Sequence, residues 1–336
     1  MNTPLTFLPL SKLLRNPFYY RKCKKEYLAA CRFFGCTLID RTQTLDIGHL
    51  KFKVLDPLYD FQKTELSFKQ ISLLRAKQLL TFAQETDKRI CLLWSGGIDS
   101  TVALVALIQV AQEKGNLDNL EVLLSAESIN EFPNFFEQVI QSKINYTLYQ
   151  PPLYPLLEDK TKIFITGEHG DQLFGSDKAK YYVLSEDAFK PYPNILPFMI
   201  GRKLGTEKHT QKMLDFLVPQ IKKSPFPIDT LYDYLWWMNF SQKWQHVSLR
   251  LISKSEGLIL GQDMIHFFSS SEFQSWSISN HPLKIDRAWN TYKKVAKAFI
   301  HDFFEDEEYF LYKEKEPSLK DAIVEEKRNL FVSFLK

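Results

Sequence analysis

Short apolar runs alternate with longer segments of helical character in the middle of the chain. From Arg89 onward the runs RICLLW, LEVLLSA, INYTLYQ and KIFITG are short and mostly apolar, which is typical of buried strands. The segments STVALVALIQVAQEKG and FPNFFEQVIQSK, which lie between these runs, have the length and composition of helices. Strands that alternate with helices predict right-handed βαβ units and a parallel sheet with helices on both faces. The sequence therefore predicts an α/β fold.

The flanking segments have different patterns. Alternation around Asp46-Ile47-Gly48 in CTLIDRTQTLDIGHLKFKVLDPL predicts a hairpin, and SFKQISLLRAKQLLTFAQET has the apolar spacing of a helix. Beyond about Lys180 strand signals fade, and the aromatic-rich remainder predicts mainly helices. We expect a small N-terminal α+β domain of unknown role over residues 1–88 and a larger domain over residues 89–336.

Composition narrows the class of protein. The chain has 336 residues, of which 45% are hydrophobic, and this is enough for two domains with cores. The net charge of the whole chain is only +3, which gives no indication of a nucleic-acid partner or an anionic membrane. A local basic cluster near the start fits a solvated helix face or, as the minority interpretation, an acidic partner. Its members are Lys12, Arg15, Arg21, Lys22, Lys24 and Lys25.

Localisation follows from the apolar runs and the cysteines. No run approaches the about 20 apolar residues that span a bilayer, and the start lacks the order of a signal peptide. The four cysteines show no C-x-x-C pair. We expect reduced thiols in a cytoplasmic protein without a membrane partner.

The segment Ser95-Gly96-Gly97-Ile98-Asp99-Ser100 joins the first predicted strand to the first predicted helix of the sheet. Adjacent glycines allow a tight turn, and their N–H groups, with those at the helix start, form a cradle for an anion. Ser95, Ser100 and Thr101 add hydroxyl donors. Asp99 suits such a site if Mg²⁺ stands between it and a phosphate. The segment is neither a Walker nor a dinucleotide loop, and an ordinary turn with Asp99 as N-cap is the other interpretation.

A second polar motif, TGEHGDQLFGSD, follows the predicted strand KIFI. Because carboxyl ends of parallel strands meet at one edge of a sheet, we expect it near the first motif. Two carboxylates at this edge, Asp99 and Asp171, can hold metal ions, and a third, Glu168, can act as a base. A polar loop between a strand and a helix is the alternative.

Both motifs resemble those of a known family. SGGIDS resembles the pyrophosphate loop SGGxDS of the N-type ATP pyrophosphatases, a superfamily that includes asparagine synthetase, GMP synthetase, tRNA-lysidine synthetase and the deazaguanine synthases. TGEHGDQLFGSD resembles the SGEGSDELFGGY segment of asparagine synthetase, β-lactam synthetase and lasso-peptide cyclase. The resemblance covers about residues 89–320 and is specific in these two motifs. It implies a Rossmann-like sheet of the adenine nucleotide alpha hydrolase type and cleavage of ATP between its α and β phosphates.

The resemblance also implies roles for single residues. Asp99 and Asp171 would bind Mg²⁺, and Glu168 would handle the proton of an attacking amine. The implied ATP contacts are Leu93, Trp94, Ser95, Gly96, Gly97, Asp99, Ser100, Thr101, Ser125, Thr166 and Gly167. The Trp94 ring is equally suited to stack on the base of ATP or to pack in the protein core.

The segment YKKVAKAFIHDFFEDEEYFLYKEKEPSL resembles the family segment in which a helix precedes an R-x-K element. Lys315 falls at the catalytic lysine, which reaches the α-phosphate, and Lys313 at the arginine; a charge-alternating surface is the other interpretation. The sequence departs from the family pattern at His169, Gly170, Gln172 and Ser176-Asp177, and it lacks the E-x-R-x-P-F-L-D run.

These implications predict an ATP- and Mg²⁺-dependent carboxylate–amine ligase that adenylates a small-molecule carboxylate, releases pyrophosphate and forms an amide. No residue matches the N-terminal cysteine of a glutaminase domain, so nitrogen is expected as free ammonia, from a separate amidotransferase subunit, or as an amine on a substrate. Two alternatives stay open. One is a nucleobase- or tRNA-modifying ATP pyrophosphatase, which would bring nucleic acid in as a partner. The other is a nucleotide-binding pseudo-enzyme.

Overall fold

The four apolar runs that predict strands form one parallel sheet in the computed structural model, which describes residues 4–58, 62–150, 152–205, 210–255 and 257–313. The strands are β1 (Arg89–Leu93), β2 (Leu120–Leu124), β3 (Asn145–Leu148), β4 (Lys162–Thr166) and β5 (Met264–His266). Their order is β3-β2-β1-β4-β5, and every neighbouring pair is parallel. The α/β class is therefore confirmed. β5 lies where strand signals fade in the sequence and was not predicted.

The strand order reverses beside β1. The chain runs outward from β1 through β2 to β3 and then returns to the other side of β1 to form β4 and β5. At the carboxyl end of this switch Leu93 of β1 pairs with Thr166 of β4. Connections diverge at such a point, which makes it the usual ligand site of open parallel sheets. Both glycine motifs begin here, one directly after β1 and the other directly after β4.

The chain divides into two compact units, each built from three segments. Unit 1 comprises residues 1–62, 171–250 and 284–292, and unit 2 comprises residues 63–170, 251–283 and 293–336. The predicted boundary after residue 88 differs from this division for two reasons. The helix that follows the N-terminal segment packs on the sheet unit, and a long segment after β4 joins the N-terminal residues.

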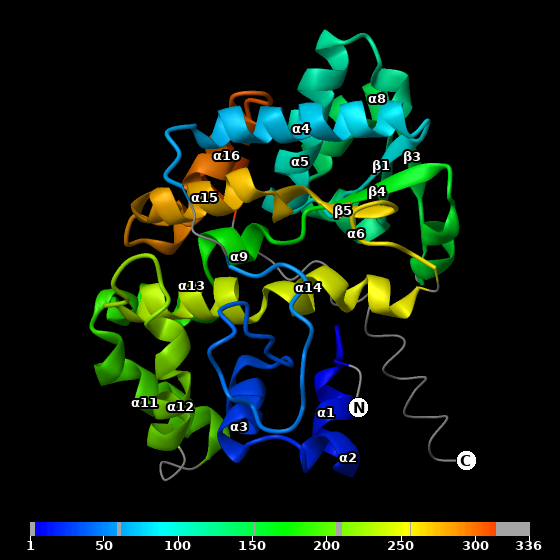
Figure 1. Ribbon diagram of the computed structural model, residues 1–336. Helices are drawn as coiled ribbons and strands as arrows, with labels where there is room; N and C mark the ends of the chain where they lie inside the picture. The colour runs from blue at the N-terminus through cyan, green and yellow to red at the C-terminus, as the bar shows by residue number, and fades with distance from the viewer. Residues whose placement is uncertain (1–3, 59–61, 151, 206–209, 256, 314–336) are drawn as a thin grey trace. The chain divides into compact units, whose positions relative to one another are not determined.

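Unit 2 contains the sheet and its helices. Figure 1 shows α4, α5 and α16 packed together beside the sheet, in agreement with their mutual contacts. Ser67 and Gln70 form a capping box at the start of α4, which explains why the predicted helix begins there. The helices are α4 (Phe68–Glu85), α5 (Ile98–Glu113), α6 (Ala126–Glu131), α7 (Pro133–Phe135), α8 (Gln141–Lys143), α15 (Ser271–Ser279), α16 (Lys294–His301) and α17 (Glu307–Tyr312). A π-helical turn over Phe136–Ile140 joins α7 to α8, so the helix predicted there is interrupted.

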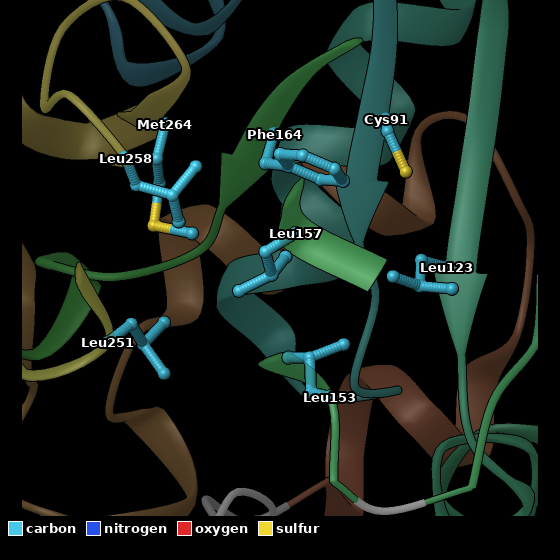
Figure 2. Close-up of a cluster of buried hydrophobic side chains, with 8 residues drawn as sticks. All are labelled: Cys91, Leu123, Leu153, Leu157, Phe164, Leu251, Leu258 and Met264. Carbon is cyan, nitrogen blue, oxygen red and sulfur yellow. The ribbon is translucent and has the colours of Figure 1, made fainter. Parts of the chain in front are cut away.

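One face of the sheet carries a cluster of buried apolar side chains (Figure 2). Cys91, Leu123, Phe164 and Met264 come from four different strands. Leu153 and Leu157, beside and within a short 3₁₀ turn (Tyr154–Glu158), pack on this face together with Leu251 and Leu258. The residues of unit 2 that pack on this cluster thus come from short turns and loops. The sequence predicts helices on both faces of the sheet.

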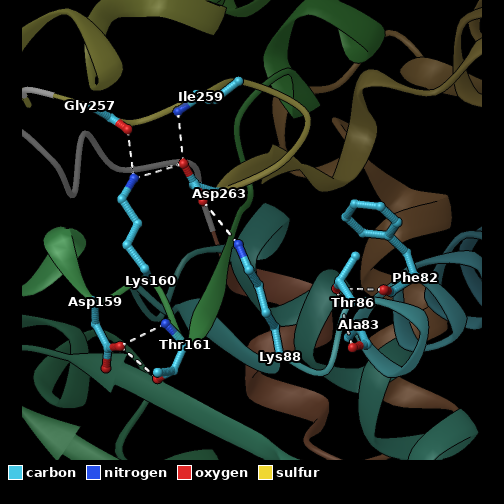
Figure 3. Close-up of polar contacts among 10 residues, drawn as sticks. All are labelled: Phe82, Ala83, Thr86, Lys88, Asp159, Lys160, Thr161, Gly257, Ile259 and Asp263. Atoms are coloured by element: carbon cyan, nitrogen blue, oxygen red, sulfur yellow. Dashed lines mark hydrogen bonds and ion pairs between the residues drawn. The ribbon is translucent and has the colours of Figure 1, made fainter.

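An ion-pair cluster joins the amino ends of three strands (Figure 3). The buried Asp263, just before β5, accepts hydrogen bonds from the ammonium groups of Lys88 (3.1 Å) and Lys160 (2.9 Å) and from the N–H of Ile259 (3.1 Å). Lys88 precedes β1 and Lys160 lies shortly before β4. The cluster is at the edge of the sheet opposite the glycine motifs, so its role is to hold the strands together.

Unit 1 is helical. Its helices are α1 (Leu10–Arg15), α2 (Pro17–Tyr20), α3 (Lys25–Phe34), α10 (Lys180–Leu184), α11 (Tyr192–Leu204), α12 (Thr210–Ile221), α13 (Leu231–Gln242) and α14 (Trp244–Arg250). The short helix α9 (Gly170–Phe174) begins at the boundary between the units. The aromatic residues of α13 are buried, and the helix itself agrees with the mainly helical prediction for this region.

The predicted N-terminal hairpin is wrong. Within the described residues, the segment that contains Asp46 forms only isolated bridges, and its backbone bonds go elsewhere. The N–H groups of Ile39 and Arg41 donate to the carbonyls at the end of α13, and Lys53 pairs with Leu5. The alternation in the sequence therefore reflects packing on distant segments. No helix among the described residues has both the length and the apolar character needed to cross a membrane.

Candidate functional site

The β1–α5 loop is held in shape by its own serines. The Ser100 hydroxyl accepts a hydrogen bond from the N–H of Ser95 (3.1 Å) and donates to the carbonyl of Gly97 (3.1 Å). The Ser95 hydroxyl lies 3.0 Å from that of Ser100 and accepts from the N–H of Gly97 (3.4 Å). These serines were predicted as ligand contacts. In the structure their hydroxyl groups fix the conformation of the loop.

Gly96 allows the loop to lie against α6. It adopts a φ of +75°, and a Cβ at this position would be 2.7 Å from the Cβ of Glu131 and would overlap the carbonyl oxygen of Ser128. A larger residue would therefore push the loop away from α6 and strain the backbone. The loop is thus fixed from outside by packing as well as from inside by its serines.

The start of α5 faces the end of this loop. Gly97 is the N-cap, and the first helical hydrogen bond runs from the N–H of Thr101 to the carbonyl of Gly97 (3.0 Å). The N–H groups of Ile98, Asp99 and Ser100 precede that bond and have no carbonyl acceptor within the helix. Together with the dipole of a 16-residue helix they create a positive potential suited to a phosphate.

The second motif touches the first through two glycines. A Cβ on Gly167 would be 2.7 Å from the backbone nitrogen of Ser100, and a Cβ on Gly170 would overlap the carboxylate of Asp99. Gly170 departs from the family pattern that the sequence resembles. The structure explains why glycine occurs at this position: the space between the backbone of residue 170 and the Asp99 carboxylate has no room for a side chain larger than a hydrogen atom.

Asp99 pairs with a lysine that the sequence did not suggest. The Nζ of Lys293 lies 2.7 Å from one carboxylate oxygen of Asp99 and 2.6 Å from the other. The Lys293 side chain is only 1% exposed, against 21% for Asp99. Lys293 sits at the N-cap of α16 with a φ of +60°. The family resemblance implies roles for Lys313 and Lys315, which follow the segment YKKVAKAF. The spacing of residues in that segment does not indicate a role for Lys293.

Glu168 is buried and its backbone position is fixed. Its N–H donates to the hydroxyl of Thr166 (3.2 Å), and that hydroxyl lies 2.7 Å from Nδ1 of His266. The His266 ring meets His169 edge to face, with centroids 5.1 Å apart. Thr166 was predicted to contact ATP through its backbone. Its side chain joins the end of β4 to the end of β5.

Three of the predicted ATP contacts, Leu93, Trp94 and Ser125, lie in packed surroundings. Trp94 is 2% exposed, stacks on Phe135 with centroids 6.0 Å apart, and donates from its indole to the hydroxyl of Thr101 (3.0 Å). Of the two interpretations of Trp94, the core position is the one observed. Ser125 caps α6, and Leu93 packs against the apolar cluster of Figure 2.

Residues from the C-terminal part of unit 2 approach the same edge. Lys313 forms an ion pair with Glu131 (3.0 Å), and both side chains are largely buried. Burial raises the pKa of the Tyr309 phenol, and the charges of Glu131 and Asp99 add to the increase. Lys315, predicted as the catalytic lysine, lies outside the described residues.

Asp171 belongs to unit 1, whereas the residues above belong to unit 2. Its carbonyl accepts hydrogen bonds from the side chain of Asn239 (2.9 Å) and from the N–H of Gly175 (2.9 Å). Gln172, another departure from the family pattern, bonds to the same Asn239 (3.3 Å). The segment after Gly170 is thus tied to α13.

Within the described part of the chain, no three His, Cys, Asp or Glu side chains come together as a metal site. This arrangement still suits Mg²⁺ that arrives with a nucleotide, because this ion is commonly bound by one or two carboxylates and by phosphate oxygens. Asp99 is the carboxylate beside the phosphate cradle. The ammonium group of Lys293 lies at the same place, 2.6 Å from the Asp99 carboxylate.

No protein-family model and no curated protein matches this chain. The structure shows an α/β protein in which two glycine motifs meet at the switch point of a parallel sheet.

Proposed function

We propose that this protein is an ATP- and Mg²⁺-dependent carboxylate–amine ligase whose unit 2 holds the phosphates of ATP at the β1–α5 loop. The observation that carries the proposal is the direct contact between the two motifs. Gly167 and Gly170 lie against Ser100 and Asp99 at the point where the strand order reverses. Helix-start amides, a carboxylate and a buried ammonium group converge there, which is the donor set that a polyphosphate with a divalent cation requires.

The residues have distinct roles in this proposal. The N–H groups at the start of α5 bind the departing diphosphate, and Lys293 offsets its charge. Asp99 would hold Mg²⁺, which when bound neutralises the phosphates, and Asp171 is the second ligand that the sequence suggests. A substrate carboxylate oxygen attacks the α-phosphorus, and the bond from that phosphorus to the bridging oxygen breaks.

Amide formation completes the reaction. The amine nitrogen attacks the acyl carbon, AMP leaves with the electron pair of the broken C–O bond, and Glu168 accepts the amine proton. Burial and the bond from its N–H to Thr166 keep Glu168 in place for this role. Lys313 and Lys315 are the proposed cations for the charge that develops on the α-phosphate.

Exchange of labelled pyrophosphate into ATP tests the proposal without knowledge of the amine. The full chain, Mg²⁺, ATP and pools of small carboxylic acids should give exchange that depends on the acid, followed by AMP release when amines are added. Gly170→Ala should abolish exchange, because the new Cβ overlaps the Asp99 carboxylate. Gln141→Ala, at an exposed position of α8, is the control. Release of ADP in place of AMP would contradict the scheme.

One observation favours a second candidate, a nucleotide-binding protein without turnover. Lys293 already neutralises Asp99, so the cradle can attract a nucleotide in the absence of a metal ion. This candidate expects ATP binding that is equally strong with and without Mg²⁺, and no exchange with any carboxylic acid. Titration of ATP in the presence of a chelator separates the two candidates.

A further inference from the structure

The two units differ strongly in charge. Unit 1 contains 23 Lys and Arg residues against 14 Asp and Glu, a formal charge of +9, whereas unit 2 contains 20 against 26, a formal charge of −6. The small net charge of the whole chain conceals this asymmetry. A strongly basic part within a nearly neutral protein indicates an anionic partner for that part.

The basic character of unit 1 is concentrated at its start. Residues 1–35 hold seven Lys and Arg and a single acidic residue, Glu26. Six of these cations are exposed on or beside α1 to α3: Lys12, Arg15, Arg21, Lys24, Lys25 and Arg32. Lys24 is bonded to Asp46 (2.6 Å), and both side chains are well exposed, so solvent screens this pair. We call this region the α1–α3 surface.

Aromatic rings lie among these cations. Phe18 is 56% exposed, and the ammonium group of Lys22 lies 3.8 Å from the centre of its ring. Lys12 lies 5.9 Å from the ring of Tyr19, and Arg32 lies 6.0 Å from that of Tyr20. A flat exposed ring surrounded by positive charge is the arrangement on which a nucleic-acid base stacks while its phosphates are neutralised.

A second basic group lies at the other end of α3. The ammonium group of Lys203 donates to the carbonyl of Phe33 in the last turn of α3 (2.8 Å). Just beyond that turn, the charges of Lys243, Lys178, Arg250 and Lys203 all act on the buried thiol of Cys36. Burial lowers the pKa of Lys178, and the neighbouring Lys203 lowers it further. Positive charge is thus placed at both ends of a helix that is about 15 Å long.

We propose that the α1–α3 surface of unit 1 binds a single-stranded nucleic acid, with phosphates on its cations and a base on Phe18. Cations separated along a helix match the repeated charges of such a strand. A membrane fits less well, because Phe18 is the single large apolar side chain that is exposed among the described residues up to Phe34, and the buried residues of α3 pack against α11 and α12. The inference does not depend on the chemistry proposed for unit 2.

Fluorescence anisotropy of labelled oligonucleotides of about 20 residues, one of RNA and one of DNA, tests this inference on the full chain. Both should bind at low salt and weaken steeply as salt rises. Lys12→Ala/Arg21→Ala/Lys25→Ala should weaken binding at least about tenfold and reduce the slope of log K against log salt by about 2, because three phosphate contacts are lost. Phe18→Ala should weaken binding by about tenfold with little change in this slope. The ratio of the two affinities assigns RNA or DNA as the natural class.

The matched control removes three exposed lysines of unit 2: Lys77→Ala/Lys114→Ala/Lys143→Ala. It makes the same change in net charge and should leave binding unchanged. An equal loss in this control, or no binding of either oligonucleotide by the parent protein at low salt, would overturn the inference. Tighter binding to vesicles of phosphatidylcholine and phosphatidylserine would overturn it in favour of a membrane. Circular dichroism checks that each variant is folded. Pyrophosphate exchange into ATP should be unchanged in the Lys12→Ala/Arg21→Ala/Lys25→Ala variant, which would show that the loss of nucleic-acid binding is independent of the function proposed for unit 2.

Discussion

Asp99 and Lys293 place two opposite charges at the centre of the candidate site. The ammonium group of Lys293 is almost fully enclosed and bonds to both oxygens of Asp99. Such a pair contributes little net stability, because the attraction mainly offsets the loss of hydration of both charges. Removal of one partner is costly, since the other charge then has neither water nor a counter-ion. The pair therefore fixes the geometry of the loop more than it stabilises the fold.

Lys293→Met tests this pair. We expect the free energy of unfolding to fall by about 2–3 kcal/mol, below the full cost of a buried unpaired charge because water reaches part of Asp99. ATP affinity should fall as well, since the ammonium group beside the phosphates is lost. Urea unfolding and calorimetric titration with ATP measure the two effects.

The double variant Asp99→Asn/Lys293→Met is the control. With both charges removed, much of the stability should return while ATP binding stays weak, because the coupling between the two residues is electrostatic. Restored ATP binding in the double variant would show that neither charge serves the nucleotide.

Residue types in the motifs were informative in part. Glycine is required at Gly96, where the sequence suggested a tight turn, and also at Gly167 and Gly170, where no such reason was apparent from the sequence. The serine hydroxyl groups bond within the loop, and their contacts with a ligand stay a prediction. Residue type shows that a hydroxyl is needed, but only the folded loop shows which acceptor lies within reach.

Among the secondary-structure elements, most strands could be predicted from the sequence, but the hydrogen-bond partners of the segments around them could not. Runs such as RICLLW are buried on both faces, so an uninterrupted apolar pattern identifies them. β5 has three residues and is too short for any pattern to identify. The alternation around Asp46 arose from bonds to α13 and to Leu5, and a sequence cannot distinguish these partners from a neighbouring strand.

Asp263 links the amino ends of β1, β4 and β5, and it makes the stability of the sheet dependent on pH (Figure 3). Burial alone would raise the pKa of this carboxyl group, but hydrogen bonds from Lys160 and Lys88 lower it below its usual value of 3.8. A carboxyl group whose pKa is lower in the folded state contributes stability above the unfolded-state pKa. That contribution is lost as the pH falls through the folded-state pKa.

Asp263→Asn should therefore destabilise the protein by about 2 kcal/mol at neutral pH, because two charge-assisted hydrogen bonds are lost. The difference from the parent protein should shrink as the pH falls below about 4, where the parent loses the same contribution. Urea unfolding at several pH values measures this difference. Asp118→Asn, at an exposed position, is the control. A difference that stays constant down to pH about 3 would show that the ion pairs do not carry the effect.

At the scale of the whole molecule, the chain passes repeatedly between its two units. Arg41 shows why the N-terminal segment depends on residues far along the chain. Its guanidinium group is 1% exposed, donates to the carbonyl of Phe240 (3.1 Å) and lies 4.5 Å from the centre of the Trp244 ring. Without α13 and α14 these two contacts would be lost, and the ion pair with Asp56 (3.1 Å) would remain. The N-terminal segment is thus part of a larger unit.

Residues 1–88 expressed alone should not fold. Arg41 and Ile39 would lose their bonds to α13, and α4 would lose the sheet unit on which it packs. We expect the fragment to give a circular dichroism spectrum with little helix and narrow dispersion of amide proton shifts. A well-dispersed spectrum would restore the division that the sequence suggested. The full chain, measured under the same conditions, is the reference.

The class of fold, four of the five strands of the sheet and the place of the two glycine motifs at strand ends could be predicted from the residues alone. These features depend on neighbouring residues, because burial, helix propensity and turn geometry leave local patterns. The tertiary structure decided the pairing of Asp99 with Lys293, the core position of Trp94, the need for Gly170 and the composition of the two units. Each of these joins residues that are distant along the chain, and the packing that brings them together leaves no periodic trace in the sequence.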